Sequence, residues 1–267
     1  MYSKACIDIA SLGFVVVALE HEDGTASYAK PEGASERLPY RGPPKGFEYE
    51  RDNVIEFREP FLEHRMGEVS AALAFMRKGA VTDAKMEPHS DLARLESVFA
   101  RVDRDNFWLA GHSFGGTSTV VASQQPWAAD AQGFVLLDVW PFPVPREIAA
   151  EGFSKPVLSI LSDEFASGRE VALTYDMFAN SSTLDKHNFY IPGTRHQQFS
   201  DFAFAMRGFM LRVSKVCGFT TSEESQRAIF AALSGFLSRS NGDYDPESWA
   251  EEAVRSTALE FTPKSLL

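Results

Sequence analysis

The sequence predicts a single α/β domain over residues 1–267, with a mostly parallel sheet covered by helices on both faces. Short runs of continuous apolar residues indicate strands that are buried on both faces, which is typical of parallel sheets. These runs alternate along the chain with segments of helical periodicity, as in α/β proteins. The 267 residues are enough to bury a substantial core without disulfides or metals, and no internal repeat or linker divides them.

The N-terminal part of the chain predicts one helix, one buried strand and one irregular insertion. Residues 2–11 have helical periodicity, and Gly13 suits the end of that helix because glycine adopts positive φ without steric cost. The unbroken apolar run Phe14–Leu19 predicts a buried strand. Residues 22–53 are rich in Gly, Pro and charged residues, and this stretch is long enough to be a lid-like insertion or a mobile loop.

The remaining elements alternate between helices and strands. A helix is predicted over 57–76, with Pro60 in its first turn, and another over 90–100. Further strands are predicted at 107–110, 133–137, 156–161 and 188–191. Further helices are predicted at 115–123, 169–179, 199–213 and 222–237, and residues 220–267 are expected to form a C-terminal helical segment.

Composition and charge exclude several classes of protein. Hydrophobic residues make up 44% of the chain and charged residues 24%, the balance of an ordered globular protein. The net charge of −11 argues against nucleic acid as a partner, because nucleic-acid binding needs a basic face. No apolar run reaches the roughly 18 residues of a membrane span. No spacing of cysteines is typical of a zinc site, so we expect no metal and no other cofactor.

The motif that carries chemistry is Gly111-His112-Ser113-Phe114-Gly115, which fits G-x-S-x-G between a predicted strand and a predicted helix. In such a nucleophile elbow the chain turns so sharply that the serine is strained, and the residues two before and two after it must be small. The turn exposes the Ser113 hydroxyl and makes the backbone N–H of Phe114 an oxyanion donor. The motif predicts an α/β-hydrolase fold with Ser113 as nucleophile; the competing interpretation is a glycine-rich turn without chemistry.

A serine nucleophile needs a base and an orienting acid, which on this fold follow in the order Ser, acid, His. Two histidines follow Ser113. His187 precedes the predicted strand at 188–191, whereas His196 follows it, at the carboxyl edge where the sites of open α/β sheets lie. We therefore expect His196 to be the base and His187 to be a surface residue.

Two aspartates fit the position of the acid. Asp138 ends the predicted strand at 133–137, and Asp163 follows the one at 156–161. Both lie at the carboxyl edge. The sequence favours Asp138, because the apolar run ends directly at its carboxylate, but it leaves Asp163 open.

Four segments resemble the platelet-activating factor acetylhydrolases, calcium-independent serine phospholipases A2 that remove a short sn-2 acyl group. They are the run from Ile7 to His21, the elbow Gly111–Gly116, the acid segment Leu137–Pro143 and the histidine segment His196–Phe202. The resemblance implies Ser113 as nucleophile, Asp138 as acid and His196 as base. It also implies that Trp140 and Phe142 line the acyl pocket.

The resemblance implies a serine esterase that hydrolyses the sn-2 acetyl or short acyl ester of a glycerophospholipid. Two alternatives stay open: a general carboxylesterase or lipase, and a catalytically impaired remnant that acts as a binding protein. In the family, strands and a His-Gly-type loop precede the helix that matches residues 2–11, so the resemblance implies that the first strands and the second oxyanion donor are missing here. The protein is expected in the cytoplasm if Met1 is its natural start, and secreted or at a membrane if a leader precedes it.

One predicted helix carries an apolar cluster with two interpretations. The side chains are suited to contact a lipid surface or, as we expect, to pack in the core behind the histidine loop. They are Phe199, Phe202, Phe204, Phe209 and Met210.

Two arginines on the helix predicted at 57–76, Arg58 and Arg65, match arginines of the family. Because charged side chains on a helix are mostly solvated, we expect both to form exposed salt bridges.

Overall fold

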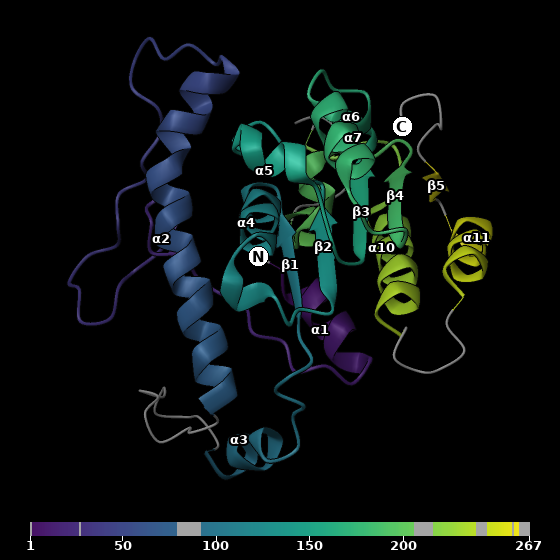
Figure 1. Ribbon diagram of the computed structural model, residues 1–267, viewed down its shortest axis with the longest axis horizontal. Coiled ribbons are helices and arrows are strands. Elements are labelled where there is room, and N and C mark those ends of the chain that lie inside the picture. Colours follow the sequence, from purple (N-terminus) through teal and green to yellow (C-terminus); the bar gives the residue numbers. More distant parts are fainter. Residues whose placement is uncertain are drawn as a thin grey trace.

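The computed structural model describes residues 2–26, 28–78, 92–205, 216–238, 245–257 and 259–261. Its centre is a five-stranded sheet in the order β1-β2-β3-β4-β5 (Figure 1). The strands are β1 (Trp108–His112), β2 (Gly133–Leu137), β3 (Val157–Ser162), β4 (Lys186–Ile191) and β5 (Glu260–Phe261). The first four are parallel, and β5 is antiparallel to β4, so the prediction of a mostly parallel sheet is confirmed.

The sheet is buried on both faces. Every residue of β2 and β3 is buried, and neighbouring residues of a strand enter opposite cores. Val135 and Leu137 pack in one apolar cluster, whereas Phe134 and Leu136 pack in the other. This two-sided burial explains why the strands appear in the sequence as continuous apolar runs.

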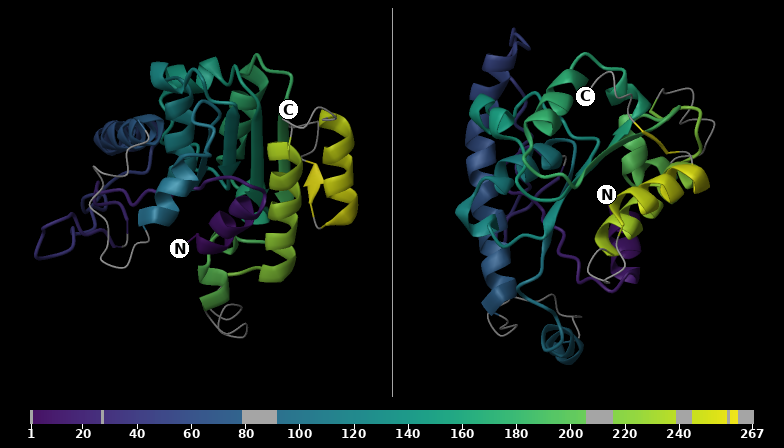
Figure 2. Two further views of the ribbon diagram at one scale, coloured as in Figure 1. Left: turned by 90° about the horizontal axis from the view of Figure 1, so that it is seen from below. Right: turned by 45° about the vertical axis from the view of Figure 1, so that its right-hand side comes forward.

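Helices cover the two faces of the sheet, as predicted (Figures 1 and 2). One face carries α4 (Phe114–Ser123), α5 (Arg146–Glu151) and α7 (Val171–Asn180), with α2 (Arg51–Lys78) packed outside α4. The other face carries α1 (Ser3–Ser11), α10 (Ser222–Leu237) and α11 (Pro246–Ser256). Shorter elements are α3 (Leu92–Phe99), α6 (Asp163–Ala166), α8 (Phe202–Ala205) and two turns of 3₁₀ helix, η2 (Pro126–Ala128) and η3 (His196–Phe199). Among the described helices, none combines the length and the apolarity that crossing a membrane requires.

The prediction of a buried strand at Phe14–Leu19 is wrong. The segment makes no strand pairing within the part of the chain that the structure describes. Val15 and Val17 are 42% and 49% exposed, while Phe14 packs at the edge of the core. A continuous apolar run indicates a buried strand only if a neighbouring strand pairs with it, and β1 pairs only with β2 among the described strands.

Helix α2 begins earlier than the sequence indicates. It starts at Arg51, six residues before the predicted start, so Pro60 lies inside the helix and not in its first turn. A proline there removes one helical hydrogen bond, and the helix continues past it to Lys78 while packing against α4. The described residues from 22 to 50 contain no helix or strand.

The helix predicted at 199–213 is described only in part. Its described residues form the end of η3 and the short helix α8, and the rest lies outside the described residues.

Candidate active site

The turn between β1 and α4 holds Ser113 in a strained conformation. Ser113 has φ 58° and ψ −121°, in a region that residues with a side chain rarely adopt. Two backbone hydrogen bonds to the adjacent strand and loop fix it. Ser113 N donates to Leu137 O at 3.1 Å, and Trp140 N donates to Ser113 O at 3.1 Å. The hydroxyl therefore lies at the carboxyl edge of the sheet, directly before a helix N-terminus.

The two glycine positions of the motif differ in whether a side chain would fit. A Cβ at Gly111 would lie 2.0 Å from the carbonyl oxygen of Gly115, so any side chain there is excluded. A Cβ at Gly115 would meet no atom within 4 Å. The expectation that both positions must be small to avoid collision is therefore right for Gly111 and wrong for Gly115.

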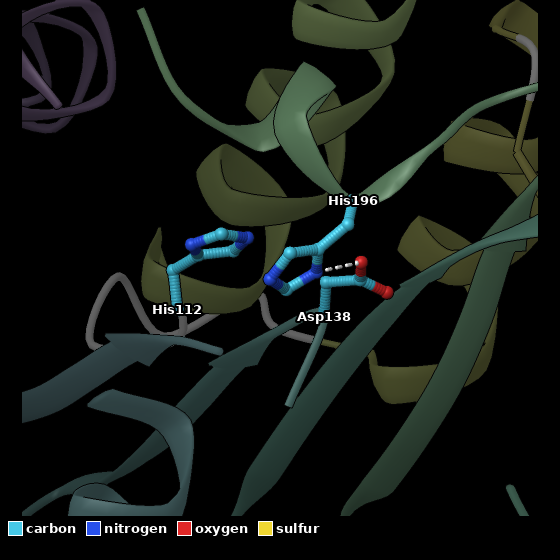
Figure 3. A group of neighbouring side chains, drawn as sticks. All are labelled: His112, Asp138 and His196. Carbon is cyan, nitrogen blue, oxygen red and sulfur yellow. Dashed lines mark hydrogen bonds and ion pairs between the residues drawn. The ribbon is translucent and has the colours of Figure 1, made fainter. Parts of the chain in front are cut away.

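The structure brings Ser113, Asp138 and His196 together in one hydrogen-bonded chain. The Nε2 atom of His196 lies 2.8 Å from Ser113 Oγ, and its Nδ1 atom lies 2.6 Å from Asp138 Oδ2. The contact between His196 and Asp138 is drawn in Figure 3. The three side chains come from the elbow after β1, the end of β2 and the start of η3. All three sites follow parallel strands, so their carboxyl ends meet at one edge.

Asp138 is held rigidly in the sheet edge. It is fully buried and has a positive φ of 46°. Its Oδ1 accepts a hydrogen bond from Ser162 N at 2.6 Å, and its Oδ2 accepts one from Ser162 Oγ at 2.9 Å. These donors fix the position of the oxygen that faces His196.

The alternative acid, Asp163, lies one strand further along and has a different partner. Its Oδ2 accepts a hydrogen bond from the backbone N–H of Gly193 at 2.9 Å. This bond ties α6 to the loop that precedes His196. His187 lies near the start of β4, where Nε2 is 3.0 Å from Asp185 Oδ1, and so it is at the opposite end of that strand from His196.

Two rings enclose the imidazole of His196. Phe165 stacks on it with ring centres 4.5 Å apart and planes 4° apart. His112 stacks on it at 4.5 Å and 27°, and Figure 3 shows the two imidazoles side by side. The rings restrict the rotation of His196 about its side-chain bonds and so favour the orientation that reaches both partners.

His112 is itself buried and held by the N-terminal segment. The hydroxyl of Tyr2 lies 2.8 Å from His112 Nδ1. Burial, and then the positive charge of His196, lower the pKa of His112 to about 3, so it is neutral at physiological pH. Burial also raises the pKa of Tyr2. Both groups therefore contribute no charge beside His196.

The same region contains the one cluster of metal-ligand type among the described residues. Ligand atoms of His112, Asp138 and His196 all lie within 4.8 Å of one another. Both ring nitrogens of His196 are already hydrogen bonded, as are both oxygens of Asp138. The Nε2 atom of His112 is enclosed and has no hydrogen-bond partner among the described residues. Hydrogen bonding within the site thus accounts for the cluster except for this one atom.

The aromatic residues assigned to the acyl pocket contact different partners. Trp140 contacts Phe114, the residue after the serine, with ring centres 6.1 Å apart. Phe142 lies beside Arg169, whose guanidinium carbon is 5.9 Å from the ring centre. A cavity of about 790 Å³ between α2 and the preceding segment is lined by neither Trp140 nor Phe142. The assignment of both residues to an acyl pocket stays a prediction.

Arg58 and Arg65 of α2 are buried, so the prediction of exposed salt bridges is wrong. Arg65 forms a buried ion pair, with Nε 2.6 Å from Asp23 Oδ2, and its other nitrogens donate to Thr25 and Ser118. Arg58 is 9% exposed and lies among aromatic rings. The burial of Arg58 and Arg65 could not be predicted from the sequence, because residues from other segments of the chain cover them.

The described members of the apolar cluster on the helix predicted at 199–213 differ in burial. Phe199 is buried in the core, as expected, whereas Phe202 and Phe204 are exposed. Phe209 and Met210 lie outside the described residues. Because Phe202 and Phe204 are exposed, contact of these two side chains with a lipid surface stays a prediction.

Several residues of the site were missed in the sequence, namely Tyr2, Ser162 and Phe165. His112 was seen only as a variable position of the motif. Ser162 had a usable signal, because it ends β3, which neighbours the strand that Asp138 directly follows. Tyr2 and Phe165 had none, since their positions depend on how α1 and α6 pack.

The parallel sheet flanked by helices is that of an α/β-hydrolase. A ferulic acid esterase from Streptomyces cinnamoneus has a similar structure, with a TM-score of 0.54 over 88% of this chain and 62% of that chain. The sequence identity is 18%, so this likeness concerns the fold alone.

The chain belongs to the family of platelet-activating factor acetylhydrolase, isoform II, whose sequence model matches residues 1–257. It is 30% identical to the platelet-activating factor acetylhydrolase of Bos taurus, over 82% of this chain and 47% of that protein. The Cavia porcellus acetylhydrolase is 27% identical over 93% of this chain and 56% of its own length. A putative phospholipase A2 of Schizosaccharomyces pombe is 24% identical, over 93% and 67%. The chain thus spans about half the length of the acetylhydrolases it matches.

Proposed function

We propose that the protein is a serine esterase that hydrolyses the sn-2 acetyl or short acyl ester of a glycerophospholipid. The observation that carries the proposal is the hydrogen-bonded chain from Ser113 Oγ through His196 to Asp138. Membership of the family supports the choice of substrate. The named relatives are acetylhydrolases of platelet-activating factor, an acetylated phospholipid.

In the first half of the reaction Ser113 Oγ attacks the ester carbonyl carbon, and His196 Nε2 takes the hydroxyl proton. Asp138 stabilises the imidazolium and keeps its Nδ1–H pointed at the carboxylate. The negative charge on the former carbonyl oxygen is stabilised by the N–H of Phe114. This N–H belongs to the first turn of α4, where N–H groups lack acceptors within the helix.

The intermediate then collapses. The bond to the alcohol oxygen breaks, and that oxygen takes the proton from His196, so a lysophospholipid leaves and an acyl-Ser113 ester remains. In the second half His196 removes a proton from water, which attacks the acyl carbonyl. Ser113 leaves with the proton from His196, and the carboxylic acid is released.

Hydrolysis of a short-chain p-nitrophenyl ester and of an acetylated ether phospholipid tests the proposal. We expect the protein to cleave both and the Ser113→Ala variant to cleave neither. Asp138→Asn is expected to lower turnover by about 10⁴-fold, because the histidine loses its tautomer. The matched control Asp163→Asn removes a carboxylate from the same edge and should lower turnover only a few-fold. Unchanged activity of Ser113→Ala, or a larger loss for Asp163→Asn than for Asp138→Asn, would contradict the mechanism.

A further inference from the structure

Arg58 is a cation that is buried on the inner side of α2, with no anionic partner among the described residues. It is 9% exposed, and it makes no hydrogen bond or ion pair with any residue that the structure describes. Its Nε is fully enclosed and unsatisfied, whereas the terminal nitrogens keep some access to solvent. Arg65, two turns further along α2, is equally buried but binds Asp23, Thr25 and Ser118. Within the described part of the chain, Arg58 thus lacks the kind of neutralising partner that Arg65 has.

Aromatic rings surround the Arg58 guanidinium. Its carbon lies 5.1 Å and 5.6 Å from the ring centres of Phe57 and Phe61 on its own helix. It lies 5.0 Å from the ring centre of Phe114 and 5.4 Å from that of Trp140. Such rings attract a cation but do not neutralise it. A guanidinium that is desolvated in this way gains strongly from an incoming anion.

The rings place this cation beside the reaction centre. Phe114 follows Ser113 directly, and its ring also contacts the guanidinium of Arg65, whose carbon is 4.3 Å from the ring centre. Trp140 follows Asp138 by two residues, and its backbone N–H donates to Ser113 O. Since Arg65 is paired with Asp23, the uncompensated charge at the elbow belongs to Arg58.

We propose that Arg58 binds the phosphodiester group of the substrate while Ser113 attacks the neighbouring ester. This inference rests on the proposed function and adds the group that makes a phospholipid preferred over a neutral ester. In a glycerophospholipid the phosphate is attached to the glycerol carbon next to the one that bears the sn-2 ester. A guanidinium presents several N–H donors in a plane that matches two phosphate oxygens. Arg58 is thus a specificity-determining residue and takes no part in proton transfer.

The first test compares two substrates. The ratio of kcat/KM for an acetylated phospholipid to kcat/KM for p-nitrophenyl acetate is measured in wild type, Arg58→Gln and Arg58→Lys. Loss of a charged hydrogen-bonding group should lower this ratio by about 10- to 100-fold in Arg58→Gln. Arg58→Lys should recover part of it, because the charge remains while the planar donor pair is lost.

Arg77→Gln is the matched control. Arg77 also lies on α2 and over a ring, that of Phe107 at 5.3 Å, but it is paired with Asp130 at 2.9 Å. The ratio should stay at its wild-type value in this variant. An equal loss on both substrates in Arg58→Gln would show a purely structural role and overturn the proposal, as would an unchanged ratio.

A second test does not depend on catalysis. The thermal unfolding midpoint is measured with glycerophosphocholine, and in a separate arm with inorganic phosphate. A ligand that binds only the folded state raises the midpoint, so glycerophosphocholine should raise it in wild type and in Arg77→Gln but not in Arg58→Gln. An effect of inorganic phosphate alone would assign the site to a free anion and overturn the substrate role. If wild type cleaves neither ester, the proposed function fails, and this arm still decides whether Arg58 binds a phosphodiester.

Discussion

The strained backbone conformation of Ser113 requires a glycine at position 111. Its positive φ brings the carbonyl oxygen of Gly115 into the space that a Cβ at Gly111 would occupy. The strained elbow is therefore possible only because Gly111, two residues before the nucleophile, has no side chain. Gly115 takes part in this contact through its carbonyl oxygen, and the contact does not require residue 115 to lack a side chain.

The asymmetry of the two glycines gives a paired prediction. Gly111→Ala should lower the free energy of unfolding by about 3 kcal/mol or more, because the added methyl cannot be accommodated without moving backbone. Gly115→Ala should change it by less than about 1 kcal/mol, because the site is open and alanine favours a helix. Urea unfolding of both variants measures the difference. Equal destabilisation by the two substitutions would contradict the geometry of the elbow.

His112 makes stability depend on pH. Its pKa is lowered from 6.5 in the unfolded chain to about 3 by burial, so the unfolded state binds more protons below pH 6.5. The stability that the neutral ring provides is complete above pH 6.5 and is lost as the pH falls toward 3. In this window His112 contributes a slope of up to about 1.4 kcal/mol per pH unit.

His112→Phe removes this titration while keeping a ring beside His196. We expect the free energy of unfolding of the variant to fall less steeply between pH 6.5 and pH 3 than that of wild type. Denaturant unfolding at several pH values gives the two slopes. Because the other histidines, including His21, are present in both proteins, the difference in slope reports His112. Parallel curves would show that the ring is not buried in its neutral form.

At the scale of elements, the ion pair of Arg65 and Asp23 connects α2 to the start of the irregular segment. Asp23 is fully buried and is also bound by Thr25. The same guanidinium contacts Ser118 on α4 and the ring of Phe114. This one arginine therefore links three parts of the chain behind the elbow.

Breaking this pair from one side should be costly. Asp23→Asn leaves a buried guanidinium without its anion, and we expect it to lower the free energy of unfolding by about 3–5 kcal/mol. The double variant Asp23→Leu/Arg65→Met should be closer to wild type, because no unpaired charge remains. Urea unfolding compares the variants. The exposed pair of Arg77 and Asp130 is the control, and Asp130→Asn should cost less than about 1 kcal/mol. A similar small cost for Asp23→Asn would mean that the pair is not buried in solution.

At the scale of the whole molecule, the accuracy of the sequence predictions follows from burial. Strand β2 has the predicted bounds, Gly133–Leu137, because both of its faces are covered and the apolar run ends at a buried aspartate. Phe14–Leu19 is also a continuous apolar run, but no strand among the described residues pairs with it, so apolarity alone was misleading. Strand β5 is two residues long, too short for any periodicity to indicate.

The residues of the site also differ in whether the sequence could predict their positions. The meeting of Ser113, Asp138 and His196 was predictable because each follows a parallel strand, and the carboxyl ends of such strands share one edge. Their chemical roles stay predictions. The supporting residues were not predictable, because Arg58, Arg65 and His112 become buried only when α1 and α2 pack on the elbow. Charge in a sequence indicates exposure by default, and long-range packing decides otherwise here.

Activation of the Ser113 hydroxyl by His196 is the step on which the proposed hydrolysis depends. The rate at which a fluorophosphonate probe labels the protein, with the labelled residue identified by mass spectrometry, tests it most directly. We expect labelling of Ser113 alone in wild type, and a rate lower by about 10³-fold or more in His196→Gln. Labelling of another residue, or an undiminished rate in His196→Gln, would contradict it.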